Sequence, residues 1–198
     1  MRGRISYLSL ALLLAGCYSG RGAAEPADTR DPKTRVYAAA LDARYVADAK
    51  LLGREAKLLL VVDKTSADLE RFRERRKEMR LAPQDVLDDF EAKNSQPRAL
   101  NSDFGLKVRT LTVSEEEVRR LAQVKDGTMD SKPLQDKYPD ASGVITLSRV
   151  GFNRDFTQAL VEVDRGWCGR GCGEGTFVLL VKEDSRWKIR EYYGGYMA

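Results

Sequence analysis

The chain has 198 residues, with 34 basic and 30 acidic side chains, a formal net charge of +4 and no histidine. This length suits one domain, and the lack of histidine excludes Ser-His-Asp and Cys-His catalysis and removes the commonest metal ligand. The sequence also lacks a glycine-rich nucleotide-binding motif. We therefore expect no metal site, no cofactor and no nucleic-acid partner.

The first 17 residues have the pattern of an export leader. Two arginines precede an apolar run over residues 5–15, which is too short to cross a hydrocarbon core of roughly 30 Å as a helix. The run ends in Leu14-Ala15-Gly16-Cys17, which resembles the lipobox of bacterial lipoproteins. The resemblance implies that residues 1–16 are a signal peptide that is removed and that Cys17 becomes a lipidated N-terminus. The alternative is an ordinary secretory signal followed by an incidental cysteine.

Residues 17–33 are expected to form a lipidated tether, because glycine and proline recur in a polar segment. The membrane is then a partner through the lipid on Cys17. Neither residue after Cys17 is acidic, which in Gram-negative bacteria resembles sorting to the periplasmic face of the outer membrane. Losing the two arginines of the leader lowers the net charge from +4 to +2, so the basic pI does not indicate nucleic-acid binding.

The remaining residues, 34–198, are expected to form one globular domain that begins with helices. Apolar residues at three- and four-residue spacing predict helices over 34–50, 66–80 and 83–93. An apolar run over 57–63 predicts a buried strand, with a helix continuing from the preceding segment as the competing interpretation. The three expected faces consist of Val36, Tyr37, Ala40, Leu41, Arg44 and Tyr45; of Leu69, Phe72 and Met79; and of Val86, Leu87 and Phe90.

The second half is expected to be mainly strands. β-forming residues over 106–113 precede Ser114 and Glu117, which form a capping box at the start of a short helix. A loop with one helical turn is expected over 125–142. Strands are then predicted over 143–152, 157–164, 176–183 and 186–193. Their partial alternation predicts an antiparallel meander with one face in solvent. The predicted fold class is α+β, with N-terminal helices packed on a C-terminal antiparallel β-meander.

Two resemblances concern this C-terminal part. Tyr138-Pro139-Asp140, Gln158-Ala159-Leu160-Val161 and Trp187-Lys188-Ile189 belong to a pattern over 85–193 that resembles uncharacterised bacterial lipoprotein-type families. Those families imply no activity. The final hairpin is similar to the ending of nuclear-transport-factor-like cone folds, which implies helices in the concavity of a curved antiparallel sheet.

Cys168 and Cys172 are the sharpest local feature after the lipobox. They lie between two predicted strands and are separated by Gly-Arg-Gly. In an exported chain whose third cysteine carries lipid, this pair is expected to form a structural disulfide. A redox-active pair and a metal-binding pair are the alternatives.

Four other features each have a structural and a functional interpretation. The structural interpretation is favoured for all four. The basic run 71–80 is either a solvated helix or a site for lipid headgroups. The acidic residues Asp85, Asp88, Asp89 and Glu91 either favour a helix N-terminus or form paired acid/base carboxylates or a calcium site. The aromatic set is either sheet core or a stacking surface for sugars or peptides, and consists of Trp167, Trp187, Tyr192, Tyr193 and Tyr196. The pair Ser148-Arg149 is either part of a strand or contains a nucleophile.

These observations favour a lipid-anchored protein of the cell envelope that acts as a binding or assembly module, with a protein of the envelope as a further partner. The alternative is an enzyme that uses Asp, Tyr or Arg side chains in the concavity of the sheet. A deep pocket with convergent polar groups would favour the enzyme, whereas a filled concavity with an exposed apolar patch would favour the binding module.

Overall fold

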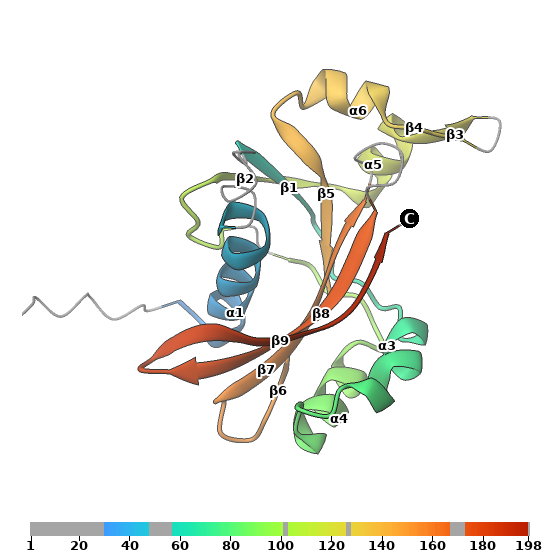
Figure 1. Cartoon of the computed structure of the whole chain (residues 1–198). Coiled ribbons are helices and arrows are strands. Elements are labelled where there is room, and N and C mark those ends of the chain that lie inside the picture. The colour runs from blue at the N-terminus through green and yellow to red at the C-terminus, as the bar shows by residue number, and fades with distance from the viewer. Residues whose placement is uncertain (1–29, 48–56, 101–102, 126–127, 167–172, 198) are drawn as a thin grey trace, which may run out of the picture.

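The fold is α+β and is built on one mixed sheet (Figure 1). A computed structural model describes residues 30–47, 57–100, 103–125, 128–166 and 173–197. Within these residues, five α-helices accompany a seven-stranded sheet in the order β2-β1-β5-β7-β8-β9, with β6 paired to β7.

The elements follow one another as helices first and the longest strands last. The helices are α1 (Pro32–Leu41), continued by the π-helix η1 (Asp42–Ala47), α3 (Glu70–Arg75), continued by the 3-10 helix η2 (Arg76–Glu78), α4 (Gln84–Lys93), α5 (Glu115–Leu121) and α6 (Lys132–Lys137). The strands are β1 (Leu58–Val62), β2 (Arg109–Val113), β3 (Gln123–Lys125), β4 (Thr128–Asp130), β5 (Ala141–Leu147), β6 (Gly151–Phe152), β7 (Gln158–Gly166), β8 (Glu174–Glu183) and β9 (Arg186–Met197).

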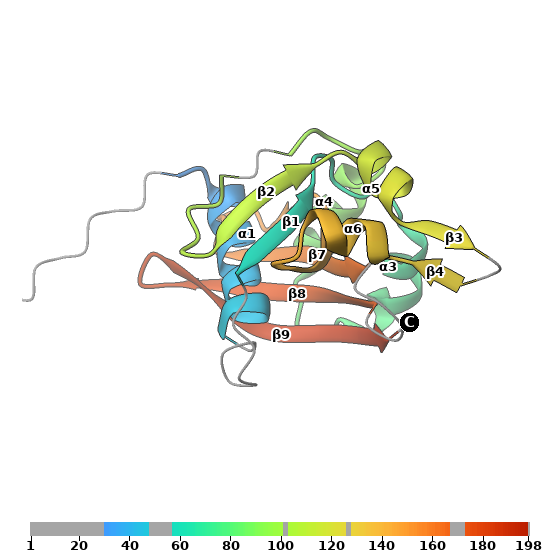
Figure 2. The same cartoon turned by 90° about the horizontal axis from the view of Figure 1, so that it is seen from above.

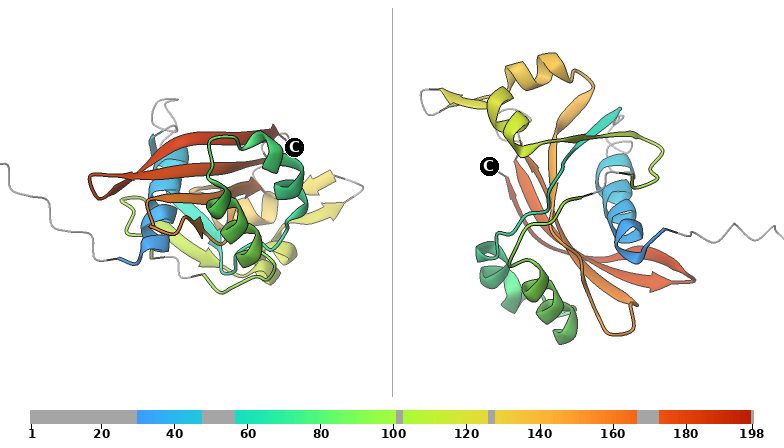
Figure 3. Two further views of the ribbon diagram at one scale, coloured as in Figure 1. Left: turned by 90° about the horizontal axis from the view of Figure 1, so that it is seen from below. Right: turned by 180° about the vertical axis from the view of Figure 1, so that it is seen from behind.

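Helices cover both faces of the sheet. Helix α1 lies across one face, where its apolar side packs on β1, β5, β7, β8 and β9. The opposite face carries two separate groups, α3 with α4 over β7–β9 and α5 with α6 over β1 and β5. The views from above, below and behind show these groups apart from one another (Figures 2 and 3).

The three N-terminal helices confirm the apolar faces expected from the sequence. The residues expected on these faces are buried, apart from the partly buried Arg44 and Leu69. Asp31 caps α1, and its carboxylate accepts hydrogen bonds from the backbone of Lys33 and Thr34. The expected helix over 66–80 is shorter, since it begins at Glu70 and ends in a 3-10 turn.

The sheet differs from the expected meander on its N-terminal side. Strands β5, β7, β8 and β9 pair antiparallel, as expected. Strand β1, whose five residues are all buried, pairs in parallel with both β2 and β5. A strand inside a parallel arrangement with both faces covered is continuously apolar, which accounts for the Leu-Leu-Leu-Val-Val run.

The expectation of one face in solvent is wrong for the central strands. In β7, Ala159 and Val161 pack beneath α1, while Leu160 packs beneath α3 and α4. The segment 125–142, expected to be a loop with one helical turn, also contains the strand β4. This strand pairs antiparallel with β3 and is followed by α6.

Candidate functional site

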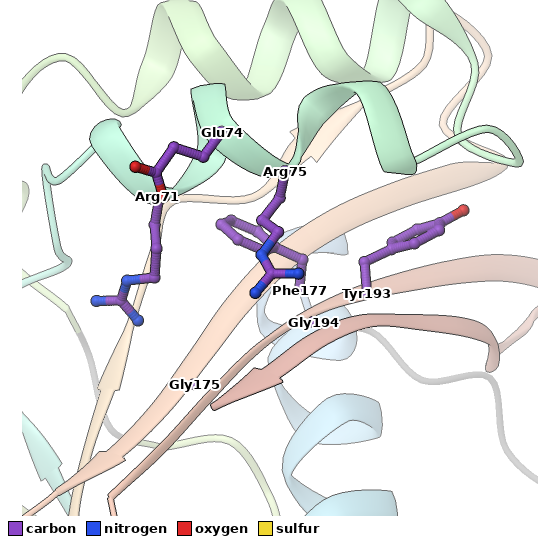
Figure 4. A pocket seen from close by; sticks show the side chains of 7 residues that line it. All are labelled: Arg71, Glu74, Arg75, Gly175, Phe177, Tyr193 and Gly194. Carbon is purple, nitrogen blue, oxygen red and sulfur yellow. The ribbon is translucent and has the colours of Figure 1, made fainter. Parts of the chain in front are cut away.

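A pocket of about 460 Å³ lies between α3 and the strands β8 and β9 (Figure 4). Helix α3 supplies one wall and the two strands supply the floor. The lining residues are Arg71, Glu74 and Arg75 from the helix and Gly175, Phe177, Tyr193 and Gly194 from the strands.

Aromatic packing holds α3 at this position. The ring of Phe72 lies 4.7 Å from that of Phe90 and 6.0 Å from that of Phe177, measured between ring centroids. Arg71 and Arg75 are four residues apart on α3, so their side chains lie on the same side of the helix and face the strands. Figure 4 shows the guanidinium of Arg75 pointing toward β8 and β9 and that of Arg71 lying to one side of it, while the carboxylate of Glu74 lies beside the helix.

Two glycines keep the floor of the pocket open. Gly175 and Gly194 place no side chain beneath the guanidinium groups. Gly194 has φ of +68°, a conformation that L side chains rarely adopt. A Cβ at this position would lie 3.6 Å from Nε of Arg75, so a side chain there would also narrow the pocket.

Arg71 connects the pocket to two carboxylates on β7. Its guanidinium lies 3.1 Å from Oε1 of Glu162 and 3.2 Å from Oδ2 of Asp164. The side chain of Glu162 is only 5% exposed. Its Oε1 accepts no hydrogen bond among the described residues, so the contact with Arg71 is an ion pair. Arg71 is therefore held in place from below.

Burial dominates the acidity of Glu162. Removal from water raises its pKa from 4.5 to about 7, against the opposing effect of the Arg71 charge, and Asp164 and Asp68 add to the rise. Near neutral pH this carboxyl is therefore only partly ionised, and the negative charge next to Arg71 depends on the pH.

Arg75 is held more weakly than Arg71. Its partner is Glu78 at 3.0 Å, and the two side chains are 41% and 48% exposed. Exposed pairs of this kind contribute about 0–1 kcal/mol, so an anionic group on a ligand can replace Glu78 at little cost. An apolar part of the same ligand would meet Phe177 and Tyr193 on the floor.

A pocket with several polar side chains is the feature that we expected of an enzyme, but the arrangement of these side chains suits binding better than proton transfer. A carboxyl with a pKa of about 7 is in the range that general acid–base catalysis uses. Glu162, however, lies beneath Arg71 and does not itself line the pocket. A ligand in the pocket would meet guanidinium groups and aromatic rings.

The residues expected to carry lipid and the disulfide, Cys17, Cys168 and Cys172, lie outside the described residues. The lipid anchor and the disulfide therefore stay predictions.

The acidic residues of α4 have structural roles. Asp89 binds Lys93 and accepts a hydrogen bond from the backbone of Phe152, while Asp85 accepts one from Arg154. The other two carboxylates pair with arginines of the basic run, Asp88 with Arg76 and Glu91 with both Arg73 and Arg76. Within the described part of the chain, no group of three or more acidic or cysteine side chains could hold a metal ion.

The aromatic set and the Ser148-Arg149 pair also separate into parts. Trp187 belongs to the core beneath α1, Tyr193 lines the pocket, and Tyr192 lies on the surface beside Arg44. Ser148 is 2% exposed, and its hydroxyl accepts a hydrogen bond from the backbone of Glu162. This hydroxyl is a sheet contact.

Sequence reasoning missed Glu162 and gave Arg71 no specific role. With β7 expected to have one face in solvent, Glu162 looked like an ordinary surface residue. The available signal was Leu160 on the same strand face, because an apolar side chain there indicates a cover over its neighbour.

Comparison of the chain with family models, curated proteins and solved structures finds no match. Among the described residues, no helix is long and apolar enough to cross a membrane.

Proposed function

We propose that this protein is a lipid-anchored binding module of the cell envelope, held at a membrane through Cys17. Its ligand occupies the pocket between α3 and the strands β8 and β9. The observation that carries the binding role is the pocket itself, where Arg75 lies next to the aromatic rings of the floor and Arg71 lines the pocket beside it. The lipobox supports the anchor.

The geometry favours a ligand with an anionic group joined to a flat or apolar part. The anionic group would pair with Arg75, whose present partner Glu78 is exposed. The apolar part would lie against Phe177 and Tyr193. Arg71 would add N–H donors at little ordering cost, because Glu162 and Asp164 already hold its guanidinium in place.

Crosslinking in intact cells tests the binding role. A photoreactive amino acid replaces Glu74 at the pocket rim in the full chain, and the matched control carries it at Lys132, whose side chain is 75% exposed on α6. We expect a discrete adduct, identified by mass spectrometry, from position 74 alone. An added Arg75→Glu substitution should reduce it at least about tenfold, as expected for losing a charge-assisted contact of about 1.5 kcal/mol or more. Equal adducts from both positions, or no effect of Arg75→Glu, would reject the pocket as the ligand site.

The anchor is tested separately. Treating cells with an inhibitor of lipoprotein signal peptidase should make a larger precursor accumulate. A Cys17→Ser chain should lose metabolic labelling with palmitate. If the inhibitor causes no precursor to accumulate and Cys17→Ser does not change the palmitate labelling, the leader is an ordinary secretory signal.

An enzyme that acts at the same pocket is the second candidate, because Glu162 has a pKa of about 7. This candidate requires that the crosslinked ligand is chemically changed and that Glu162→Gln abolishes the change. The binding module requires that the ligand leaves unchanged.

A further inference from the structure

One end of the molecule brings together the first turn of α1, the β6–β7 turn and the β8–β9 turn. Figures 1 and 3 show these three segments at the same end, where the described part of the chain also begins. The guanidinium of Arg35 donates a hydrogen bond to the carbonyl of Ser185, which joins α1 to the β8–β9 turn. We call residues 30–35, 153–157 and 182–188 the turn surface.

Phe156 stands out on the turn surface because it violates two structural preferences. The residue is 50% exposed, and its backbone has φ of 53°, a left-handed conformation that is unfavourable for a bulky residue. A glycine would adopt this conformation without strain. A turn that needed only to connect two strands would therefore be better served by glycine.

The turn holds Phe156 firmly. The side-chain oxygen of Asn153 accepts hydrogen bonds from the backbone of Thr157 and of Gln158, both at 2.8 Å, and the Asn153 carbonyl accepts one from Phe156 at 3.1 Å. The ring of Phe156 lies 5.2 Å from that of Phe152, which in turn lies 5.9 Å from Trp187. An aromatic ring is thus presented to solvent on a fixed support.

The turn surface has an excess of basic residues, seven against four acidic ones. Arg154 lies two residues before Phe156 in the turn. Lys182 lies on the neighbouring strand, where it donates its N–H to the Thr157 carbonyl at 2.8 Å. Neither cationic group has an ion-pair partner among the described residues. An exposed aromatic ring flanked by cations is the chemistry of membrane-interface binding.

We propose that the turn surface docks on the membrane that holds the lipid anchor, with Phe156 at the headgroup boundary and the basic side chains on anionic phospholipids. This inference rests on the proposed lipidation of Cys17. Residues 17–29 can reach at most about 45 Å at about 3.4 Å per residue, and they join the domain at Arg30, on the docking end. The anchor therefore keeps this surface near the bilayer, where a weak contact becomes effective.

The test uses the mature lipidated protein reconstituted into phosphatidylcholine vesicles with and without phosphatidylglycerol. Flotation of the vesicles reports the anchor. Amide hydrogen exchange reports docking, with the same protein in detergent as the reference. We expect the chain to float with both vesicles, and residues 153–157 and 183–186 to exchange several-fold more slowly in the vesicles that contain phosphatidylglycerol.

A Phe156→Asn variant should float equally but lose the protection, since asparagine tolerates the left-handed backbone. The matched control is Leu111→Asn, at a residue 38% exposed on β2, which should keep the protection. Flotation without protection of the turns would overturn the docking proposal and leave the anchor intact. Failure to float would overturn the anchor and the docking proposal with it.

Discussion

Glu162 is an ionisable residue whose carboxyl the fold buries. Its carboxyl is buried on β7 and, among the described residues, pairs with one cationic group, that of Arg71 at 3.1 Å. Burying a carboxylate is costly unless it is paired and hydrogen-bonded. The rise of its pKa to about 7 is the physical expression of that cost.

The first prediction follows from this pKa. The folded protein keeps the Glu162 proton up to about pH 7, whereas the unfolded chain loses it near 4.5. Unfolding is therefore increasingly favoured as the pH rises between these values, and the stabilisation present below about pH 4.5 is gone above about pH 7. Glu162→Gln stays neutral. As the pH rises from about 4.5 to about 7, the free energy of unfolding of Glu162→Gln should therefore increase relative to that of the natural protein, by about 3 kcal/mol at most.

Urea unfolding at pH 4, 6 and 8 measures this difference. Glu183→Gln is the control, because Glu183 lies on the surface and its pKa is lowered by a hydrogen bond from Lys188. Parallel pH profiles for the natural protein and Glu162→Gln would show that burial does not raise the pKa of Glu162.

At the scale of elements, the contact between α4 and β6 shows how closely the layers approach. A Cβ on Gly151 would lie 2.6 Å from Cβ of Phe90 and 2.7 Å from its backbone nitrogen. The absence of a side chain at Gly151 therefore allows β6 to approach the helix this closely.

The second prediction tests this close approach. Gly151→Ala should destabilise the fold by about 1–3 kcal/mol, because the methyl group must displace helix backbone. Gly166→Ala is the control, since a Cβ there meets nothing within 4 Å. Equal midpoints of chemical unfolding for the two variants would contradict the packing of α4 on β6.

The α4 element also explains why β5 and β6 are two strands where the sequence predicts one. The buried side chain of Asn94, at the end of α4, donates to the carbonyl of Arg149 at 2.9 Å and accepts from its N–H at 2.7 Å. Arg149 is thereby hydrogen-bonded to a side chain at the point where the strand ends. In the sequence, Asn94 looks like the start of a loop, and its distant partner leaves no local pattern.

Local patterns predict elements better than they predict neighbours. The spacing of Val36, Tyr37 and Ala40 predicts both the helix and its buried face. The run in β1 predicts a strand but cannot name β2 and β5 as its parallel partners, since these follow it at long range. The pocket depends on such partners, because Arg71 and Glu162 meet only when α3 crosses β7.

At the scale of the whole molecule, the pocket and the turn surface lie at opposite ends of β8. The strand runs from Glu174 to Glu183, which is roughly 30 Å at about 3.4 Å per residue. Gly175 and Phe177 line the pocket near its beginning, and the turn surface lies at its end. If the turn surface rests on the membrane, the pocket faces away from the bilayer, where ligands of the envelope can reach it.

The two cysteines of the proposed disulfide come, in sequence, between the described ends of β7 and β8. The described ends of β7 and β8 are paired at Arg165 and Glu174, so the segment that contains Cys168 and Cys172 begins and ends at one place. Cys168 and Cys172 are close in sequence, so a disulfide between them closes a short loop. Its contribution to stability is therefore smaller than the roughly 3 kcal/mol expected for a 15-residue loop. A bond there would secure the start of β8, next to Gly175.

The last prediction concerns this bond. Denatured mature protein should show no free thiol before reduction and two afterwards, because lipid blocks Cys17 and the other two cysteines are joined. Reduction should lower the midpoint of thermal unfolding by a few degrees, as expected for a loss of about 1–2 kcal/mol. A Cys168→Ser/Cys172→Ser chain, which has no bond to reduce, should keep the same midpoint with and without reductant. Two reactive thiols in the untreated mature protein would exclude the disulfide and leave β8 held at this end by its pairing with β7 and β9.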